Sequence, residues 1–247
     1  MKEIIEKIKL KKPLNRLDDN FVEGFVNDFF KVNTKIKNKY LDNGLKKKDI
    51  ELIVKSVRNE LNKIYGQFWV TDRLELKSHR STSERLQFYD NIYRFIFSIT
   101  GRPKRVLDLA CGLNPLSYNL IGNDVYFYVT ELTDYDCGKL REYFIKNNIK
   151  GEVIKADLRT FNDFPKVDVC FMFKLLDSIE SDGHRLAEHL IKSVNAKYIV
   201  VSFSTKTTKG RRMNYPQRGW FERMLNRLGL KYEIHYESNE VFYVVKK

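Results

Sequence analysis

The sequence predicts an α/β fold, a largely parallel sheet with helices on both faces, preceded by a helical extension and closed by an antiparallel hairpin. Three observations lead to this prediction. From about residue 105 onward, short apolar runs alternate with amphipathic helical segments, a pattern typical of a parallel sheet. The last two apolar runs are joined by a short turn alone, which indicates a hairpin. Before residue 79, the apolar residues recur at helical spacing.

The first part of the chain, residues 1–78, is expected to be a helical extension. Asp18, Asp19 and Asn20 are suited to cap a helix whose apolar residues share one face. A second amphipathic stretch follows the segment 46–49 and ends near Ile64. The apolar positions of the two helices are Phe21, Val22, Phe25, Val26, Phe29 and Phe30, then Ile50, Ile53, Val54, Val57, Leu61 and Ile64.

The remainder, residues 79–247, is expected to form the α/β domain. Ser81 as N-cap and Glu84 three residues later fit a capping box, which predicts a helix through about Ser98. Strands are predicted at Arg105–Leu109, Asp124–Thr130, Glu152–Ala156, Val167–Phe173 and Tyr198–Phe203, helices near 136–147, 181–194 and 215–228, and the hairpin at Tyr232–Tyr236 and Val241–Val245. Such a sheet with a final antiparallel strand is the hallmark of the Rossmann-like class I methyltransferase fold.

Composition restricts the class of protein. No apolar run approaches the roughly 18–20 residues that cross a bilayer, and the charged N-terminus does not resemble a signal peptide. Cys111, Cys137 and Cys170 form no Cys-x-x-Cys pair, and the four histidines do not cluster. We therefore expect a cytoplasmic protein that binds neither a membrane nor a metal.

The net charge of +13 favours a polyanionic partner, because cationic side chains release the counterions condensed on phosphates. Lysines gather in the extension, at 31–39 and 46–48. They are expected either to contact RNA phosphates or to form an ordinary solvated face.

The predicted strand ends carry the cofactor chemistry, because ligands of open α/β sheets bind at the carboxyl ends of the strands. After the first strand come Asp108, Gly112 and Asn114, in a loop where Gly112 lets the backbone turn sharply beside a ligand. This is not the Gly-x-Gly-x-x-Gly loop that admits a pyrophosphate. S-adenosylmethionine, which has no pyrophosphate, fits better.

Acidic residues follow the next two strands. Glu131, 23 residues after Asp108, is expected to accept hydrogen bonds from ribose hydroxyls, whereas Asp134 and Asp136 are expected to cap the next helix. Asp157 and Leu158 follow the third strand and are expected to flank the adenine; the alternative for Asp157 is a simple helix cap.

Arg85 is placed by the capping box in the first turn of the helix before the first strand. Its guanidinium is expected to hold the cofactor carboxylate in a bidentate manner, with help from the helix N-terminus. A surface arginine is the alternative.

Several linked motifs resemble the 16S ribosomal RNA guanine-N7 methyltransferases of the aminoglycoside-resistance group. They are His79-Arg-Ser-Thr-Ser-Glu-Arg85, Asp108-Leu-Ala-Cys-Gly-Leu-Asn-Pro-Leu116, Lys174-Leu-Leu176, Ser202-Phe-Ser-Thr-Lys-Thr-Thr-Lys-Gly210 and Trp220-Phe-Glu222, with Ile64-Tyr-Gly-Gln-Phe-Trp69 in the helical part. The resemblance covers roughly residues 60–247. It implies S-adenosylmethionine as cofactor, an extension that docks on the folded 30S subunit, and a target guanine in the decoding region.

The chain departs from that family's pattern at three positions. Glu131 stands where the family commonly has aspartate, which preserves the chemistry. Ser204 and Asp177 each stand where the family has proline, at the mouth where the base is expected to enter. These two changes bear on the target nucleotide more than on methyl transfer itself.

Residues near the last parallel strand are candidates to receive the target base, which must leave its stack. Phe203, Tyr215 and Trp220 are the aromatic candidates, with Phe203 favoured for stacking and Trp220 favoured as a packing residue. Lys206 is expected to help position the base. The basic residues Lys209, Arg211 and Arg212 are expected to grip the RNA backbone unless their loop is merely solvated, and Lys174 either neutralises a phosphate or packs its stem.

Guanine N7 carries a free lone pair, so methylation there needs no general base, and the sequence offers none. Cys170 lies inside a predicted strand and is expected to be core rather than a nucleophile. The alternatives are a methyltransferase for another RNA such as tRNA, one for a small molecule, and a non-catalytic ribosome-assembly factor.

Overall fold

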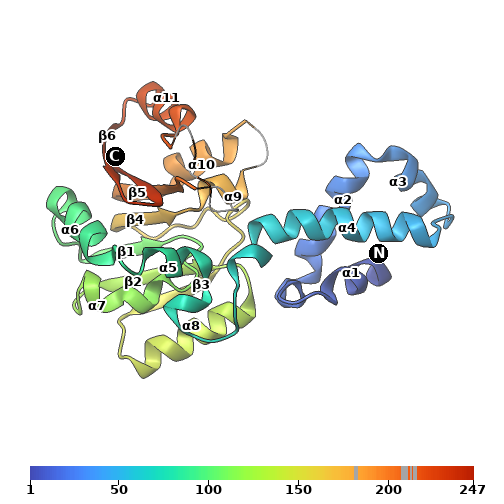
Figure 1. Cartoon of the computed structure of the whole chain (residues 1–247), viewed down its shortest axis with the longest axis horizontal. Coiled ribbons are helices and arrows are strands. Elements are labelled where there is room, and N and C mark those ends of the chain that lie inside the picture. The colour runs from blue at the N-terminus through green and yellow to red at the C-terminus, as the bar shows by residue number, and fades with distance from the viewer. Residues whose placement is uncertain (181–182, 207–210, 212, 214–215) are drawn as a thin grey trace. The chain divides into compact units, whose positions relative to one another are not determined.

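The computed structural model describes residues 1–180, 183–206, 211, 213 and 216–247, and the chain divides into two compact units, Met1–Val70 and Thr71–Lys247. The first unit is helical, as predicted (Figure 1). Its helices are α1 (Lys2–Lys9), α2 (Asp19–Val32), α3 (Thr34–Leu41) and α4 (Lys47–Ile64), with short 3-10 turns at Leu14–Arg16 and Gly66–Phe68.

The core of the first unit forms where α1 and α2 pack on α4. Only part of the predicted apolar face of α2 is buried. Val22, Val26 and Phe30 are buried, whereas Phe21, Phe25 and Phe29 are only partly buried. The α4 face contributes Ile53, Val57 and Leu61. The Arg58 guanidinium ties α4 to α1 by donating to the carbonyl of Ile8, with an Nε–O distance of 3.1 Å.

The second unit is built on a seven-stranded sheet with the order β3-β2-β1-β4-β5-β7-β6, in which β7 runs antiparallel to both of its neighbours, β5 and β6. The strands are β1 (Arg105–Asp108), β2 (Tyr126–Glu131), β3 (Gly151–Lys155), β4 (Val167–Phe173), β5 (Ala196–Ser204), β6 (Lys231–Tyr236) and β7 (Glu240–Lys246). The predicted α/β architecture and its terminal hairpin are confirmed. All seven strands begin and end within two residues of the predicted bounds.

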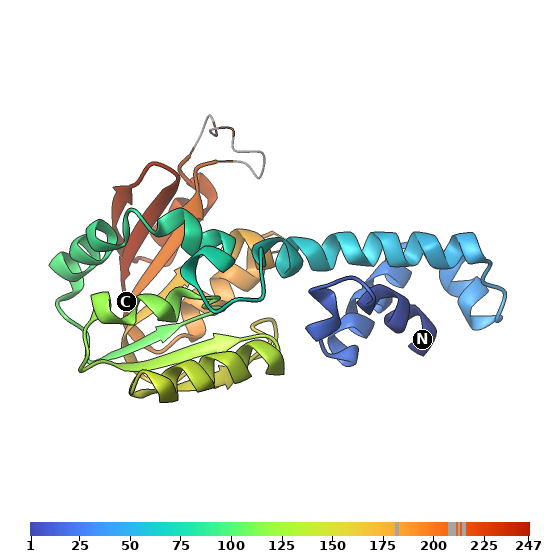
Figure 2. The same ribbon diagram turned by 60° about the horizontal axis from the view of Figure 1, so that its bottom comes forward.

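Helices cover both faces of this sheet (Figures 1 and 2). One apolar cluster joins the sheet to α6 (Tyr89–Thr100), α7 (Tyr118–Ile121) and α8 (Asp134–Lys146). The other joins it to α9 (Leu176–Ile179), α10 (Arg185–Ser193) and α11 (Gly219–Arg227). The parallel strands are therefore buried on both sides and place their carboxyl ends along one edge.

The prediction of one helix from Ser81 to about Ser98 is wrong in two respects. A short helix, α5 (Arg80–Arg85), begins after His79 and follows a 3-10 turn at Leu76–Ser78, and α6 starts only at Tyr89. Ser81 is not the N-cap, because its hydroxyl bonds the ring of His79, with an Oγ–Nδ1 distance of 2.9 Å. Arg85 consequently ends a helix rather than lying in the first turn of a longer one.

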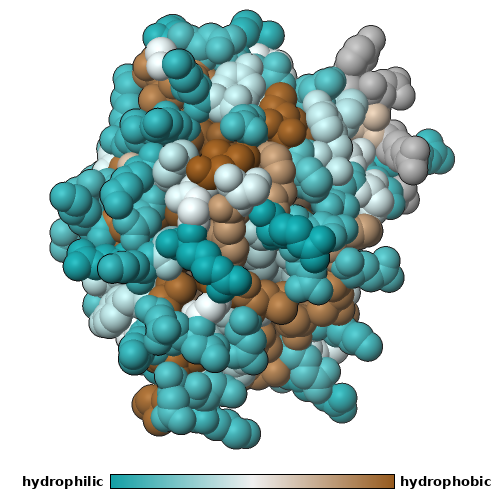
Figure 3. All heavy atoms as spheres, turned by 90° about the vertical axis from the view of Figure 1, so that its left-hand side faces the viewer, coloured by the Kyte–Doolittle hydropathy of each residue, from teal (hydrophilic) through white to brown (hydrophobic). Residues whose placement is uncertain are grey.

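The surface of the face seen in Figure 3 is mostly hydrophilic, with exposed apolar side chains between the polar ones. Within the described ranges, no helix combines the length and apolar character that a membrane span requires.

Candidate functional site

The loop after β1 is shaped by Gly112, whose φ of +55° is a left-handed conformation that favours glycine. A Cβ atom at this position would lie 2.7 Å from Cε1 and 2.9 Å from Nε2 of His79. The imidazole of His79 is buried, and burial together with the charges of Arg85 and Lys174 lowers its pKa to about 3. A neutral ring therefore packs directly against the backbone of the loop.

The ends of β1 and β2 meet at this loop. Asp108 accepts a hydrogen bond from the Asn114 side chain at 2.7 Å. Glu131 accepts one from the Gly112 amide at 2.5 Å and one from the Leu132 amide at 3.2 Å. The structure thus brings together Asp108, Gly112, Asn114 and Glu131, the predicted cofactor residues of the first two strands.

Burial perturbs both carboxyl groups. It raises the pKa of Asp108 to about 7, although the Asn114 hydrogen bond opposes the shift. It also raises the pKa of Glu131 to about 8, with a further contribution from the negative charge of Asp136. Strongly shifted acids at the carboxyl ends of strands are typical of a functional site. The prediction that Asp134 or Asp136 caps α8 is wrong, because the N-cap is Thr133, whose hydroxyl accepts the Asp136 amide, and both aspartates lie in the first turn.

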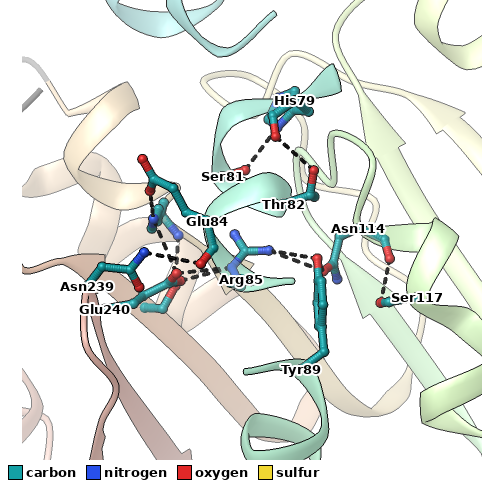
Figure 4. A network of polar contacts seen from close by, with 12 residues as sticks. His79, Ser81, Thr82, Glu84, Arg85, Tyr89, Asn114, Ser117, Asn239 and Glu240 are labelled. Carbon is teal, nitrogen blue, oxygen red and sulfur yellow. Dashed lines mark hydrogen bonds and ion pairs between the residues drawn. The ribbon is translucent and has the colours of Figure 1, made fainter. Parts of the chain in front are cut away.

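Arg85 lies at the centre of a buried polar network (Figure 4). The residue is 1% exposed, and its Nε lies 3.1 Å from each carboxylate oxygen of Glu240. The same guanidinium donates through Nη1 to the Asn114 side-chain oxygen at 3.2 Å and approaches the Tyr89 hydroxyl at 3.4 Å. Arg85 is therefore connected through Asn114 to Asp108, which places a cation beside the loop after β1. The alternative of a surface arginine is wrong.

Lys174, for which neutralising a phosphate and packing its stem were the alternatives, is the second cation of this network. The side chain is 9% exposed, forms an ion pair with Glu84 and has its Nζ 3.3 Å from Glu240. Ser202 also donates to Glu240. Lys174 therefore pairs with the buried carboxylate of Glu240 and with the exposed carboxylate of Glu84.

The sequence analysis missed Glu240, Glu84 and Tyr89 as parts of the site. Glu240 is fully buried, although it is an acid at the first position of the last strand. That unusual placement, an acid leading directly into the apolar run of β7, was the signal available in the sequence. Its partner Arg85 is 155 residues away in the chain, so the pairing itself could not be read.

Asp157 and Leu158 follow β3, as predicted. The Asp157 carboxylate forms a two-point ion pair with Arg159, with the shortest distance at 2.6 Å, and also accepts the Arg159 amide at 3.1 Å. Leu158 is buried. This arrangement matches the simple turn-capping alternative for Asp157, since its carboxylate accepts the amide of Arg159 two residues on.

Phe203 does not offer a stacking surface for a base. Its side chain is fully buried, with Phe221 and Trp220 packed edge-on at 5.2 and 5.7 Å between ring centroids. The Arg218 guanidinium lies 5.2 Å from the ring centroid of Phe203. Trp220 is half-buried and stacks on His184, with centroids 3.8 Å apart, which fits the packing role favoured for it.

Among the expected RNA contacts, Lys206 is half-buried just after β5, and Arg211 is exposed. Lys209, Arg212 and Tyr215 lie outside the described residues. All three cysteines are free and buried, and Cys170 lies inside β4, as expected. The described part of the chain contains no group of three or more histidine, cysteine or acidic residues suited to hold a metal ion.

Comparison with known proteins shows which protein family the chain matches. A family model described as ribosomal RNA methyltransferase (FmrO) matches residues 69–244. A 16S rRNA (guanine(1405)-N(7))-methyltransferase of Micromonospora rosea is 31% identical over 185 residues, which cover 71% of this chain and 66% of that protein. One of Serratia marcescens is 30% identical over 183 residues, covering 70% and 68%. The chain thus spans about two thirds of the length of these relatives.

Solved structures show the same fold over the whole chain. An rRNA methylase from Escherichia coli superposes with a TM-score of 0.75 at 22% identity, covering 100% of this chain and 99% of the other. The 16S rRNA methyltransferase RmtF, solved with S-adenosyl-L-homocysteine, gives a TM-score of 0.75 at 20% identity, covering 100% and 97%.

Proposed function

Because the chain belongs to the FmrO family of ribosomal RNA methyltransferases, we propose that it transfers a methyl group from S-adenosylmethionine to N7 of a guanine in 16S rRNA. The family resemblance predicted from the sequence motifs is confirmed. The observation that carries the proposal is the position of the family match, since residues 69–244 include every residue of the buried network and of the loop after β1.

The residues around this loop fit S-adenosylmethionine. The absence of a side chain at Gly112 leaves backbone next to the carboxyl ends of β1 and β2. Glu131, at the end of β2, has the acceptor oxygens that a ribose diol requires. Arg85 and Lys174 supply two cations near which a cofactor carboxylate would bind, beside the carboxylates of Glu240 and Glu84.

The reaction needs positioning more than proton transfer. S-adenosylmethionine supplies an electrophilic methyl group on a sulfonium. Guanine N7 attacks with a free lone pair and loses no proton, so no side chain has to act as a base. Cys170 is fully buried inside β4 and is not placed to act as a nucleophile. The buried network instead holds the loop and the cations in one geometry, which lowers the cost of aligning the reacting atoms.

The assembled 30S subunit is the proposed substrate, and the first unit is proposed to bind its RNA. A groove of about 510 Å³ lies between α1 and α4, and its lining includes Lys7, Lys11, Lys47, Lys55 and Arg58 together with the acidic Glu51. Such a cationic lining supports contact with phosphates. The proposal places the reaction in the cytoplasm.

The test is methylation with tritiated S-adenosylmethionine and three substrates: intact 30S subunits, naked 16S rRNA and bulk tRNA. Cleavage of the labelled RNA by borohydride and aniline then reports N7-methylguanosine. We expect label in 30S subunits with one cut in the decoding region. Label in tRNA alone, or label in 30S without a cut, would refute the guanine-N7 assignment. Absence of label, with cofactor still bound, would indicate a small-molecule substrate or an assembly factor.

A further inference from the structure

Arg218 connects three segments of the chain at the carboxyl ends of β4 and β5. Its guanidinium binds the Asp177 carboxylate through Nε at 3.1 Å and through Nη2 at 2.7 Å. Nη2 also donates to the carbonyl of Ser204, the last residue of β5, at 3.0 Å, and Nη1 donates to the carbonyl of Pro216 at 3.2 Å. One side chain therefore joins α9, which follows β4, to the end of β5 and to the segment that enters α11.

The position of Arg218 differs from that of the buried network. Ser202 and Phe203 are successive residues of β5, and successive side chains of a strand point to opposite faces of the sheet. Ser202 donates to Glu240 in the buried network, whereas Arg218 covers the ring of Phe203. Arg218 thus acts on the opposite face of the strand from the Arg85–Glu240 pair.

We propose that the ion pair of Asp177 and Arg218 is a positioning device for the RNA substrate, which holds α9 against Ser204 and Pro216 at the carboxyl ends of β4 and β5, where ligands of open α/β sheets bind. This inference rests on the proposed function. Arg218 is a positioning residue rather than a substrate contact, because its Nε, Nη1 and Nη2 all donate within the protein and its side chain is 11% exposed.

The sign of the effect distinguishes positioning from simple electrostatics. Asp177 is 42% exposed, and a negative charge at an RNA-binding mouth repels phosphates. If Asp177 acted only through its charge, Asp177→Asn would strengthen RNA binding. If it positions the edge, the same substitution weakens use of the 30S substrate.

The experiment compares the full-length protein with Asp177→Asn, Arg218→Lys and the conservative variant Asp177→Glu. The matched control is Glu188→Gln, which removes the two-point ion pair that joins α10 to Arg227 of α11 at 2.6 and 3.1 Å. The readouts are kcat/KM for 30S subunits, the affinity for S-adenosylhomocysteine by calorimetry and the melting temperature.

We expect Asp177→Asn and Arg218→Lys to lower kcat/KM for 30S subunits by about tenfold, as small displacements from a productive geometry do. Cofactor affinity should stay within about twofold, and Asp177→Glu and Glu188→Gln should remain near the wild type. An unchanged or raised kcat/KM in Asp177→Asn would overturn the inference, as would an equal loss in Glu188→Gln or an equal loss of cofactor affinity. A wild-type protein that labels no 30S RNA would instead refute the proposed function.

Discussion

The substitution Gly112→Ala tests how the loop after β1 is built. Gly112 has a φ of +55°, and an added Cβ would lie 2.7 to 3.0 Å from three atoms of the His79 ring. This ring cannot move away easily, since it is buried and its Nδ1 is bonded to the Ser81 hydroxyl at 2.9 Å. The added methyl group therefore meets both an unfavourable backbone conformation and a fixed neighbour.

The magnitude follows from these two costs. A left-handed backbone costs about 1–2 kcal/mol for a residue with a Cβ. Inserting a methyl group into a well-packed site costs about 1–3 kcal/mol more. Gly112→Ala should therefore lower the free energy of unfolding by about 2–5 kcal/mol. Because the Gly112 amide donates to Glu131, displacement of the loop should also weaken binding of S-adenosylhomocysteine.

The matched control is Gly229→Ala. Gly229 has a φ of +70°, but nothing lies within 4 Å of its added Cβ, so it should show the backbone cost alone. Urea unfolding gives both free energies, and calorimetry gives the cofactor affinity. Equal losses of stability in the two variants would refute the role of His79. A double-mutant cycle with His79→Ala should show coupling of about 1–3 kcal/mol with Gly112→Ala, because the smaller side chain relieves the clash.

Three further perturbations test the network, the buried acids and the extension. Glu240→Gln leaves the Arg85 guanidinium buried without its carboxylate partner, and urea unfolding should show a loss of about 3–5 kcal/mol. The pKa of Asp108 rises from 3.8 to about 7 on folding, so the folded state binds more protons than the unfolded state between these two pH values. The free energy of unfolding therefore falls as pH rises from about 4 to 7. Asp108→Asn should flatten this pH dependence in thermal melts. Replacing Lys47 and Lys55 by Gln should weaken 30S binding and reduce the slope of log affinity against log salt by about one for each phosphate that the protein no longer neutralises.

Each of these expectations has a result that contradicts it. A loss of unfolding free energy below about 1 kcal/mol in Glu240→Gln would mean that water reaches the Arg85–Glu240 pair. An unchanged pH profile in Asp108→Asn would assign the dependence to Glu131, whose pKa is also raised. An equal loss of 30S affinity for each charge removed in the control variant Lys146→Gln, on α8, would show that net charge rather than the groove is responsible.

The helix before β1 and the aromatic residue after β5 mark the limits of reading this sequence. The Ser81–Glu84 pattern predicted one helix, but the Ser81 hydroxyl is bound to His79, so the helix begins at Arg80 and breaks before Tyr89. Phe203 follows the pattern of a strand-end aromatic, yet packing by Phe221 and Trp220 removes its ring from solvent. Local patterns describe which contacts a residue is able to make, and tertiary neighbours decide which of them form.

The sequence by itself determined the order of strands and helices, the terminal hairpin and the placement of Asp108, Gly112 and Glu131 at strand ends. These features depend on periodicity and on short-range spacing, which neighbouring residues of the chain set directly. Only the tertiary structure decided that Arg85 and Lys174 meet at Glu240, because these residues are far apart in the chain and come together only when the sheet and its helices assemble. Burial then made the pairing necessary, since a charge removed from water requires a partner.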